Sequence, residues 1–152
     1  MKEFRVLVVD DEDDFRETII KRLQKRELNV TGAESGEKAL EILEKFLFDV
    51  VILDVKMPGM DGVETLQEMK KKRPLMEVIM LTGHSTVETA IDGLKLGAFD
   101  YIMKPADFDE LLKKMTSAYE KKKAHEMKIQ ESRIRELQGS PGRVFGQVKD
   151  NK

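Results

Sequence analysis

Acidic, hydroxyl and basic side chains stand directly after four apolar runs of this sequence. Asp10 and Asp11 follow the first run, Asp54 ends the second, Thr82 ends the third, and Lys104 comes after the last. If these runs are parallel strands of one sheet, their carboxyl ends meet at one edge. Three carboxylates, a hydroxyl and an ammonium group would then share one pocket, although they are far apart in the chain.

Such a pocket suits phosphoryl chemistry. Neighbouring carboxylates repel one another and need a counter-charge, which a hard cation such as Mg²⁺ supplies while it also neutralises a phosphoryl group. Asp54 emerges straight from a central apolar run and is the best placed nucleophile, and its attack on phosphorus would give an aspartyl phosphate. Lys104 would pair with one phosphoryl oxygen as a point charge, and the Thr82 hydroxyl would donate to another.

Taken singly, each of these residues has an ordinary structural explanation. An aspartate at a strand end is usually a cap or a turn residue, and the acidic run 10–14 is typical of a first helical turn. Lys104 precedes a proline, as many surface lysines in extended segments do. The hypothesis therefore depends on their coincidence at one predicted edge.

Alternating patterns predict the elements that position these residues. Apolar runs predict strands at residues 4–9, 50–53 and 78–81, a short last strand at 101–103, and a weaker strand at 29–33, which makes five in all. Apolar residues at helical spacing follow each strand, the last set beginning at Phe108. Continuously apolar strands indicate burial on both faces. We therefore predict a doubly wound α/β domain, with a five-stranded parallel sheet and five helices.

Helix boundaries carry their own signals. Capping-box spacing predicts helix starts at Asp61, Ser85 and Asp107, each with a glutamate three residues later. Apolar residues spaced through 127–137 predict that the last helix is extended, although two heptads are too few for a coiled coil. Residues 139–152 are expected to form a flexible tail.

Composition excludes several classes of protein. The chain has no cysteine, which excludes a disulfide framework and a thiolate metal site, and its two histidines leave little for a histidine metal cage. Because no apolar run approaches the ~18 residues of a membrane span and no signal peptide is recognisable, we expect a cytoplasmic protein.

Charge is distributed unevenly along the chain. Residues 1–112 carry 16 basic and 24 acidic side chains, a net of −8, whereas residues 113–152 carry 11 and 5, a net of +6. A basic tail suits nucleic acid or an acidic partner, but glutamates interleave with these positive charges. The pattern favours a solvated helix face, and we expect no direct DNA binding.

Four blocks of the sequence resemble the signature blocks of the receiver domain of two-component response regulators. They match in order and with the expected spacing, and they comprise Leu7–Glu12, Val51–Gly62, Met80–Gly83 and Gly97–Pro105. The resemblance covers residues 4 to about 120. The apolar patterns predict the domain over residues 1–121, followed by a helical extension or linker over 122–138. The stretch 82–104 is most similar to receivers of the nitrogen-regulation type, which often precede an ATPase and a DNA-binding domain.

The resemblance also implies roles for the acidic residues. Asp54 would accept a phosphoryl group from a sensor histidine kinase or a phosphotransfer protein. Asp11, Asp54 and the backbone carbonyl of Lys56 would ligate Mg²⁺, and Asp10 would assist. The chain would be a phosphoacceptor switch and not an enzyme.

A second group of residues would carry the response. Thr82 and Tyr101 would be the switch pair, and Lys104, whose bond to Pro105 is commonly cis in the family, would hold a phosphoryl oxygen. The response would alter a surface made by the fourth helix, the fifth strand and the fifth helix, through which family members often dimerise. His84 follows Thr82 in the same loop and is a surface residue on this interpretation, not a phosphotransfer histidine.

Two other functions use similar folds. A Mg²⁺-dependent phosphatase with an aspartyl nucleophile normally has a second aspartate where this chain has Lys56, and it needs a covering cap that no insertion here could form. A flavin electron carrier requires a phosphate-binding loop rich in glycine and hydroxyl residues after the first strand, and this chain is acidic there. Two kinds of response regulator remain open. The chain is either a stand-alone receiver with a downstream protein target, which is slightly favoured, or the receiver and linker of a transcription regulator whose output domain lies beyond this chain.

Overall fold

The computed structural model describes residues 4–139, in which strands and helices alternate. The elements are β1 (Arg5–Val9), α1 (Asp13–Lys25), β2 (Asn29–Ala33), α2 (Gly36–Lys45), β3 (Val50–Asp54), α3 (Gly62–Lys72), β4 (Glu77–Thr82), the short 3₁₀ helix η1 (His84–Thr86), α4 (Val87–Lys95), β5 (Asp100–Met103) and α5 (Phe108–Gly139). The described residues form two compact units, divided between Tyr119 and Glu120.

All five strands are parallel and pair in the order β2-β1-β3-β4-β5. The chain moves outward from β1 to β2, returns to the other side of β1 for β3, and continues to β4 and β5. The topological switch point therefore lies between β1 and β3, where ligands bind at the carboxyl ends of such sheets. Asp10 and Asp54 stand at these two strand ends.

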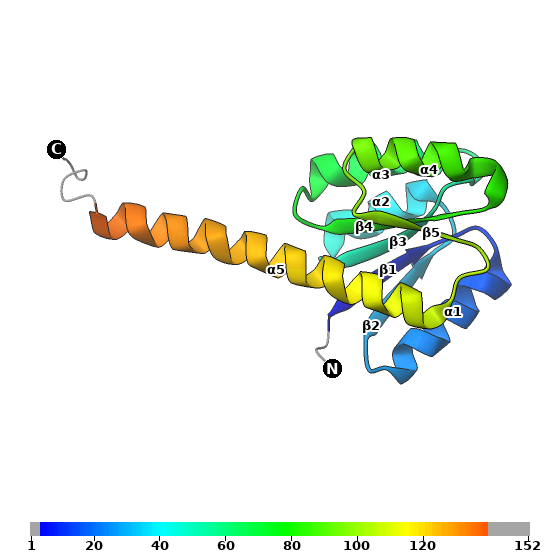
Figure 1. The fold of residues 1–152 in the computed structure, drawn as a ribbon, viewed down its shortest axis with the longest axis horizontal. Helices are drawn as coiled ribbons and strands as arrows, with labels where there is room; N and C mark the ends of the chain where they lie inside the picture. Colours follow the sequence, from blue (N-terminus) through cyan, green and yellow to red (C-terminus); the bar gives the residue numbers. More distant parts are fainter. Residues whose placement is uncertain (1–3, 140–152) are drawn as a thin grey trace. The chain divides into compact units, whose positions relative to one another are not determined.

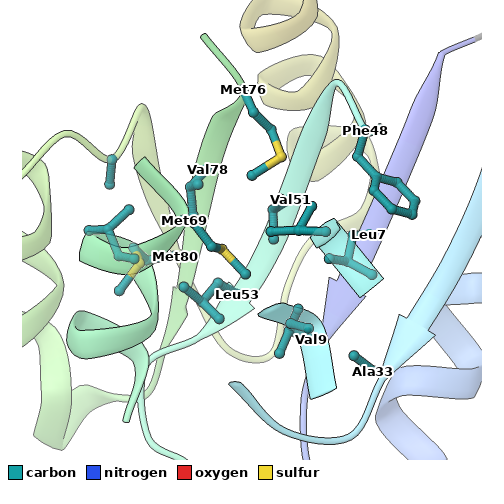
Figure 2. Packing of buried hydrophobic residues seen from close by; sticks show 14 of the residues in the cluster. Leu7, Val9, Ala33, Phe48, Val51, Leu53, Met69, Met76, Val78 and Met80 are labelled. Carbon is teal, nitrogen blue, oxygen red and sulfur yellow. The ribbon is translucent and has the colours of Figure 1, made fainter. Parts of the chain in front are cut away.

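Helices cover both faces of this sheet (Figure 1). Leu7 and Val9 of β1 pack in the cluster shared with α2, α3 and α4, and Figure 2 shows this cluster from close by. Val6 and Val8, which alternate with them, pack in the opposite cluster with α1 and the first turns of α5. Every residue of β3 is buried, as expected for a central strand covered on both sides. The predicted doubly wound fold with five parallel strands and five helices is confirmed.

The extension of the last helix is also confirmed, because α5 runs to Gly139. In the part of α5 that belongs to the second unit, Glu126 pairs with Lys122 at 2.7 Å and with Lys123 at 3.8 Å. The apolar Met127, Ile134 and Leu137 are exposed. The predicted tail, apart from Gly139, lies outside the described residues.

The three predicted helix starts have different outcomes. Asp61 forms a capping box with Glu64, as predicted. Asp107 caps α5 through the N–H of Asp109, at 3.0 Å. The prediction for Ser85 is wrong, because η1 takes up residues 84–86 and places Ser85 inside a 3₁₀ turn, so that α4 begins only at Val87.

Gly62 fixes the start of α3 against the end of β3. Its N–H donates to the carbonyl of Val55 at 2.9 Å. A Cβ atom at this position would lie 2.5 Å from the Asp54 carbonyl oxygen and 2.7 Å from Val55 Cα. Since these neighbours are backbone atoms that cannot rotate away, only glycine allows this approach, and the approach holds the backbone of Asp54 in place.

We therefore predict that Gly62→Ala lowers the free energy of unfolding by about 1–3 kcal/mol, the range for overpacking. Gly83→Ala is the matched control, because a Cβ at Gly83 meets nothing within 4 Å. Urea unfolding of both variants measures the difference, and equal stability of the two would contradict the proposed steric role.

Candidate functional site

The sheet register brings the predicted site residues to one edge. Val9 pairs with Leu53, so Asp10 and Asp54 follow neighbouring positions of β1 and β3. Asp54 pairs with Leu81, which places Thr82 one residue further along β4. The Lys104 N–H donates to the Thr82 carbonyl at 2.8 Å, which ties the end of β5 to the end of β4. Four residues separated by up to 94 positions thus meet at the carboxyl edge.

Three carboxylates form the centre of this edge. One oxygen from each of Asp10, Asp11 and Asp54 lies within 4.8 Å of the others. Asp10 is completely buried, Asp54 is 7% exposed, and Asp11 is exposed. Oxygen donors at this spacing are those that a hard divalent cation prefers, so the donor set fits Mg²⁺.

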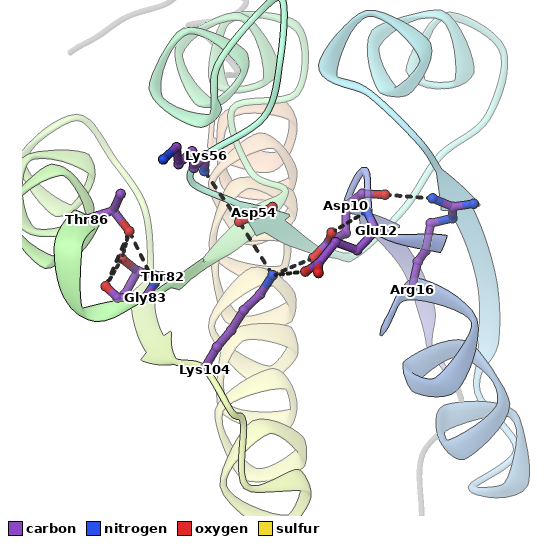
Figure 3. Close-up of polar contacts among 9 residues, drawn as sticks. All are labelled: Asp10, Glu12, Arg16, Asp54, Lys56, Thr82, Gly83, Thr86 and Lys104. Atoms are coloured by element: carbon purple, nitrogen blue, oxygen red, sulfur yellow. Dashed lines mark hydrogen bonds and ion pairs between the residues drawn. The ribbon is translucent and has the colours of Figure 1, made fainter. Parts of the chain in front are cut away.

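The Lys104 ammonium is the cation nearest to this cluster. Its Nζ lies 3.0 Å from Asp10 Oδ2, 3.3 Å from Glu12 Oε1 and 3.8 Å from Asp54 Oδ1 (Figure 3). The same Nζ lies 4.4 Å from the centroid of the Phe15 ring, a cation–π distance. Burial acts to lower the pKa of Lys104, but the hydrogen bond to Asp10 and the charge of Asp54 outweigh it, so the pKa is raised and the side chain stays charged.

The cluster changes the acidity of Asp54. Burial of its carboxyl, and next the negative charge of Asp10, raise the pKa of Asp54 from 3.8 to about 6. Lys104 and the Lys56 N–H, which donates to Asp54 Oδ1 at 3.4 Å, act in the opposite direction. Asp54 is thus an ionised but poorly compensated carboxylate at neutral pH, which is the state that a nucleophile or a metal ligand requires.

Backbone groups orient the acidic side of the site. The Glu12 N–H donates to Asp10 Oδ1 at 2.9 Å, and Arg16 donates to the Asp10 carbonyl at 2.7 Å. Arg16 is in turn paired with Asp13 at 2.7 Å. Sequence reasoning did not single out Glu12 or Arg16, because an acidic run and a basic residue in a first helical turn are common without a functional role.

A hydroxyl network forms the other side of the site. Thr82, 1% exposed, lies 3.0 Å from the Gly83 carbonyl and hydrogen-bonds the hydroxyl of Thr86. The Gly83 N–H also donates to Thr86 Oγ1, at 3.2 Å. Sequence reasoning missed Thr86, although its position four residues after Thr82, one turn away, was a usable signal.

The remaining predicted residues lie around this centre. Tyr101 pairs with Met80 in the sheet and is partly buried against the α2–α4 side of the core. His84 is exposed at the start of η1, as expected of a surface residue. The Lys104–Pro105 peptide bond is cis.

A hollow of about 530 Å³ opens over these groups. Its wall includes Asp11, Asp54, Lys56, Gly83, Thr86 and Lys104. It therefore offers carboxylates, an ammonium group and hydroxyls to one ligand, which is a set suited to an anion accompanied by a cation.

Residues 6–116 match the family of response regulator receiver domains. The chain belongs to this family. It is 44% identical over 106 residues to the transcriptional regulatory protein ZraR of Escherichia coli strain K12, which covers 70% of this chain and 24% of ZraR. It is 34% identical over 143 residues to the DNA-binding transcriptional regulator NtrC of the same strain, which covers 94% of this chain and 30% of NtrC.

Solved structures give the same result. A response regulator receiver domain protein from Clostridium thermocellum superposes with a TM-score of 0.77 at 37% identity, over 80% of this chain and 98% of that one. NtrX from Brucella abortus superposes with a TM-score of 0.79 at 32% identity, over 83% of this chain and 29% of NtrX. The resemblance to the nitrogen-regulation type is thus confirmed, and the chain is a receiver domain of two-component response regulators.

The chain spans about a quarter to a third of the length of the curated relatives it matches. Receiver domains are phosphoacceptor switches, and this general character applies to the chain. Among the described residues, no helix is both long enough and apolar enough to cross a membrane.

The raised pKa of Asp54 predicts a pH-dependent stability. The folded state binds the proton of the Asp54 carboxyl more tightly than the unfolded state does. The metal-free protein therefore loses stability as pH rises from about 4 to about 6, and stays at this lower stability above pH 6. Asp54→Asn removes the charge, so at pH 7.5 the variant should be more stable than the wild type by about 1–3 kcal/mol. The gain should vanish below about pH 4.

Urea unfolding with a chelator, at several pH values, measures this difference. Asp92→Asn is the control, because it removes an exposed carboxylate on α4. A stability difference between Asp54→Asn and wild type that does not change with pH would show that the charge of the buried Asp54 carboxylate is not its source.

Proposed function

We propose that Asp54 is the phosphoacceptor of this receiver, charged by a sensor histidine kinase or a phosphotransfer protein. The observation that carries the proposal is the position of Asp54 at the end of the central strand, with Asp10 and Asp11 within 4.8 Å and the Lys104 ammonium at 3.8 Å. Asp10 is also buried at a strand end and lies nearer to Lys104, but of these two carboxylates only Asp54 lines the hollow over the site.

In the proposed step, an Asp54 carboxylate oxygen forms a bond to phosphorus. The bond between phosphorus and the donor histidine nitrogen breaks, and the nitrogen keeps its electron pair. Because the attacking oxygen must be unprotonated, a pKa of about 6 leaves most of the Asp54 carboxylate ready at neutral pH. Lys104, whose ammonium lies 3.8 Å from Asp54 Oδ1, would neutralise a phosphoryl oxygen, and the Thr82 hydroxyl at the same edge would donate to another.

The acidic cluster is the proposed Mg²⁺ site. Asp11, Asp54 and the backbone carbonyl of Lys56 would hold the ion, with Asp10 assisting. Bound Mg²⁺ supplies charge neutralisation for the phosphoryl group and for the carboxylates. The spacing of the three carboxylates and the unfavourable ionisation of Asp54 both support this assignment.

The response is proposed to pass through Thr82 and Tyr101 to the surface of α4, β5 and α5. Phosphorylation adds charge and acceptor oxygens beside Thr82 and Lys104, and it favours whichever arrangement of these residues contacts them best. The switched surface would bind a downstream protein or a second copy of the chain. Ile91 and Leu94 of α4 are exposed and give this surface apolar area.

Residues 1–121 are proposed as the receiver and 122–138 as a helical linker. The curated relatives ZraR and NtrC are transcription regulators of which the chain matches only part, which supports an output domain elsewhere in a longer protein. A stand-alone receiver that acts by protein binding is the alternative. Direct contact with DNA is not expected of residues 1–112, because their net charge of −8 would repel phosphates. The proposed location is the cytoplasm, where ATP-dependent kinases act.

Phosphorylation at Asp54 can be tested with a small phosphodonor. With acetyl phosphate and Mg²⁺, the wild type should gain one phosphoryl group in intact-mass measurements, and Asp54→Asn should gain none. Asp92→Asn should be labelled like the wild type. Labelling of Asp54→Asn to the same extent would remove Asp54 as the acceptor.

The role of Lys104 can be tested separately. Lys104→Ala should keep the fold, but phosphorylation should no longer alter the surface of α4, β5 and α5, because no ammonium remains to contact the phosphoryl group. Amide chemical shifts should change around Asp54 on phosphorylation and stay unchanged along α4 and β5. Lys21→Ala, at an exposed position of α1, should respond like the wild type. A wild-type response in Lys104→Ala would overturn the assigned role.

A further inference from the structure

The hydroxyl of Thr86 hydrogen-bonds two neighbouring groups at once. It accepts from the Gly83 N–H at 3.2 Å and hydrogen-bonds the Thr82 hydroxyl. Figure 3 shows these three residues grouped on one side of Asp54, opposite Asp10 and Glu12. Since Gly83 and Thr86 both line the hollow over Asp54, the network forms part of its wall.

The network engages the Thr82 hydroxyl and the Gly83 N–H on this side of the hollow. One consistent set of hydrogen bonds has the Gly83 N–H and the Thr82 hydroxyl both donating to Thr86 Oγ1, and the Thr86 hydroxyl donating to the Gly83 carbonyl at 3.3 Å. A hydroxyl has a single hydrogen. A second set has Thr82 donating to the Gly83 carbonyl at 3.0 Å and Thr86 donating to Thr82. We take the first set, in which Thr82 donates to Thr86 and so cannot also donate to a group on Asp54.

We propose that Thr86 is a positioning residue that opposes phosphorylation, because its hydroxyl takes the place of a phosphoryl oxygen for the Thr82 and Gly83 donors. The inference rests on the proposed phosphorylation of Asp54. A phosphoryl group, or an analogue of it, has to draw these donors away from Thr86 before it gains their hydrogen bonds. Removing the Thr86 hydroxyl should therefore tighten binding at Asp54, whereas loss of an ordinary structural hydrogen bond would not.

The position of Thr86 connects this exchange to α4. Thr86 is the N-cap residue of α4, yet its side chain makes no capping hydrogen bond there. Hydroxyls at N-cap positions accept from first-turn N–H groups and stabilise the helix. Once released by Thr82 and Gly83, the Thr86 hydroxyl is free to cap α4, which gives the phosphoryl group a direct effect on the first turn of that helix.

Titration with beryllofluoride and Mg²⁺ tests the proposal. Beryllofluoride is a tetrahedral phosphoryl analogue that binds carboxylates, and ¹⁹F NMR of the full chain gives the half-saturating concentration. Thr86→Val keeps the shape of the side chain and removes the hydroxyl, so its half-saturating concentration should be about two- to ten-fold lower than that of the wild type, as expected for one net hydrogen bond. Thr86→Ser should match the wild type.

Two further variants complete the comparison. Thr116→Val removes a hydroxyl that bonds the Leu112 carbonyl within α5, and it should bind like the wild type. Asp54→Asn should not bind at all. Unchanged or weaker binding by Thr86→Val, or equal tightening in Thr86→Ser, would overturn the role of Thr86 alone. Failure of the wild type to bind, or binding by Asp54→Asn, would instead overturn the phosphoacceptor assignment on which it rests.

Hydrogen exchange of the Gly83 amide gives a second measurement that needs no ligand. In Thr86→Val, or in Thr86→Ala should the valine variant not fold, the Gly83 N–H loses its acceptor and should exchange several-fold faster. Thr86→Ser should retain the slower exchange. Equal exchange rates in all variants would show that Thr86 does not hold this donor, and would overturn the proposal.

Discussion

Repulsion among Asp10, Asp11 and Asp54 is the interaction on which the rest of the site depends. The fold forces it, because β1 and β3 are neighbours and both end in aspartate. Burial then raises its cost, as the pKa of Asp54 near 6 shows. Lys104 relieves only part of it, since its ammonium is nearer to Asp10 and Glu12 than to Asp54. A site in this condition gains stability from any added cation, and it favours chemistry in which Asp54 gives up its negative charge to a new bond.

The two sides of the hollow bind groups of opposite charge. The carboxylate side attracts positive charge and is held by backbone donors, such as the Glu12 N–H on Asp10. The hydroxyl side offers donors to an anion, but in the unphosphorylated chain it satisfies them internally through Thr86. Cation binding and anion binding therefore make different demands. The first needs little rearrangement of hydrogen bonds, and the second needs an exchange of partners next to α4.

Sequence alone predicted the residues whose positions follow from topology. Asp54 and Thr82 each end a strand, Asp10 and Lys104 each follow one, and parallel strands bring their ends together whatever the loops do. Glu12, Arg16 and Thr86 were not predicted, because their contacts depend on how far a side chain reaches or on the form of a loop. The η1 turn is an example: the spacing of Ser85 and Glu88 suits a helix start, but the bonds around Gly83 favour a 3₁₀ turn there. The positions of β3 and β4 were predictable, since burial on both faces leaves a continuous apolar run.

The placement of the hollow at the carboxyl edge of the sheet has a consequence for engineering. Loops at the opposite edge, such as the α2–β3 connection with its exposed Phe46 and Leu47, contribute no group to the hollow. A peptide grafted into that connection leaves the register of β3 untouched, whereas a single residue inserted within β3 would turn Asp54 toward the other face of the sheet. The amino-terminal edge is accordingly the place to attach a fluorophore or an affinity tag.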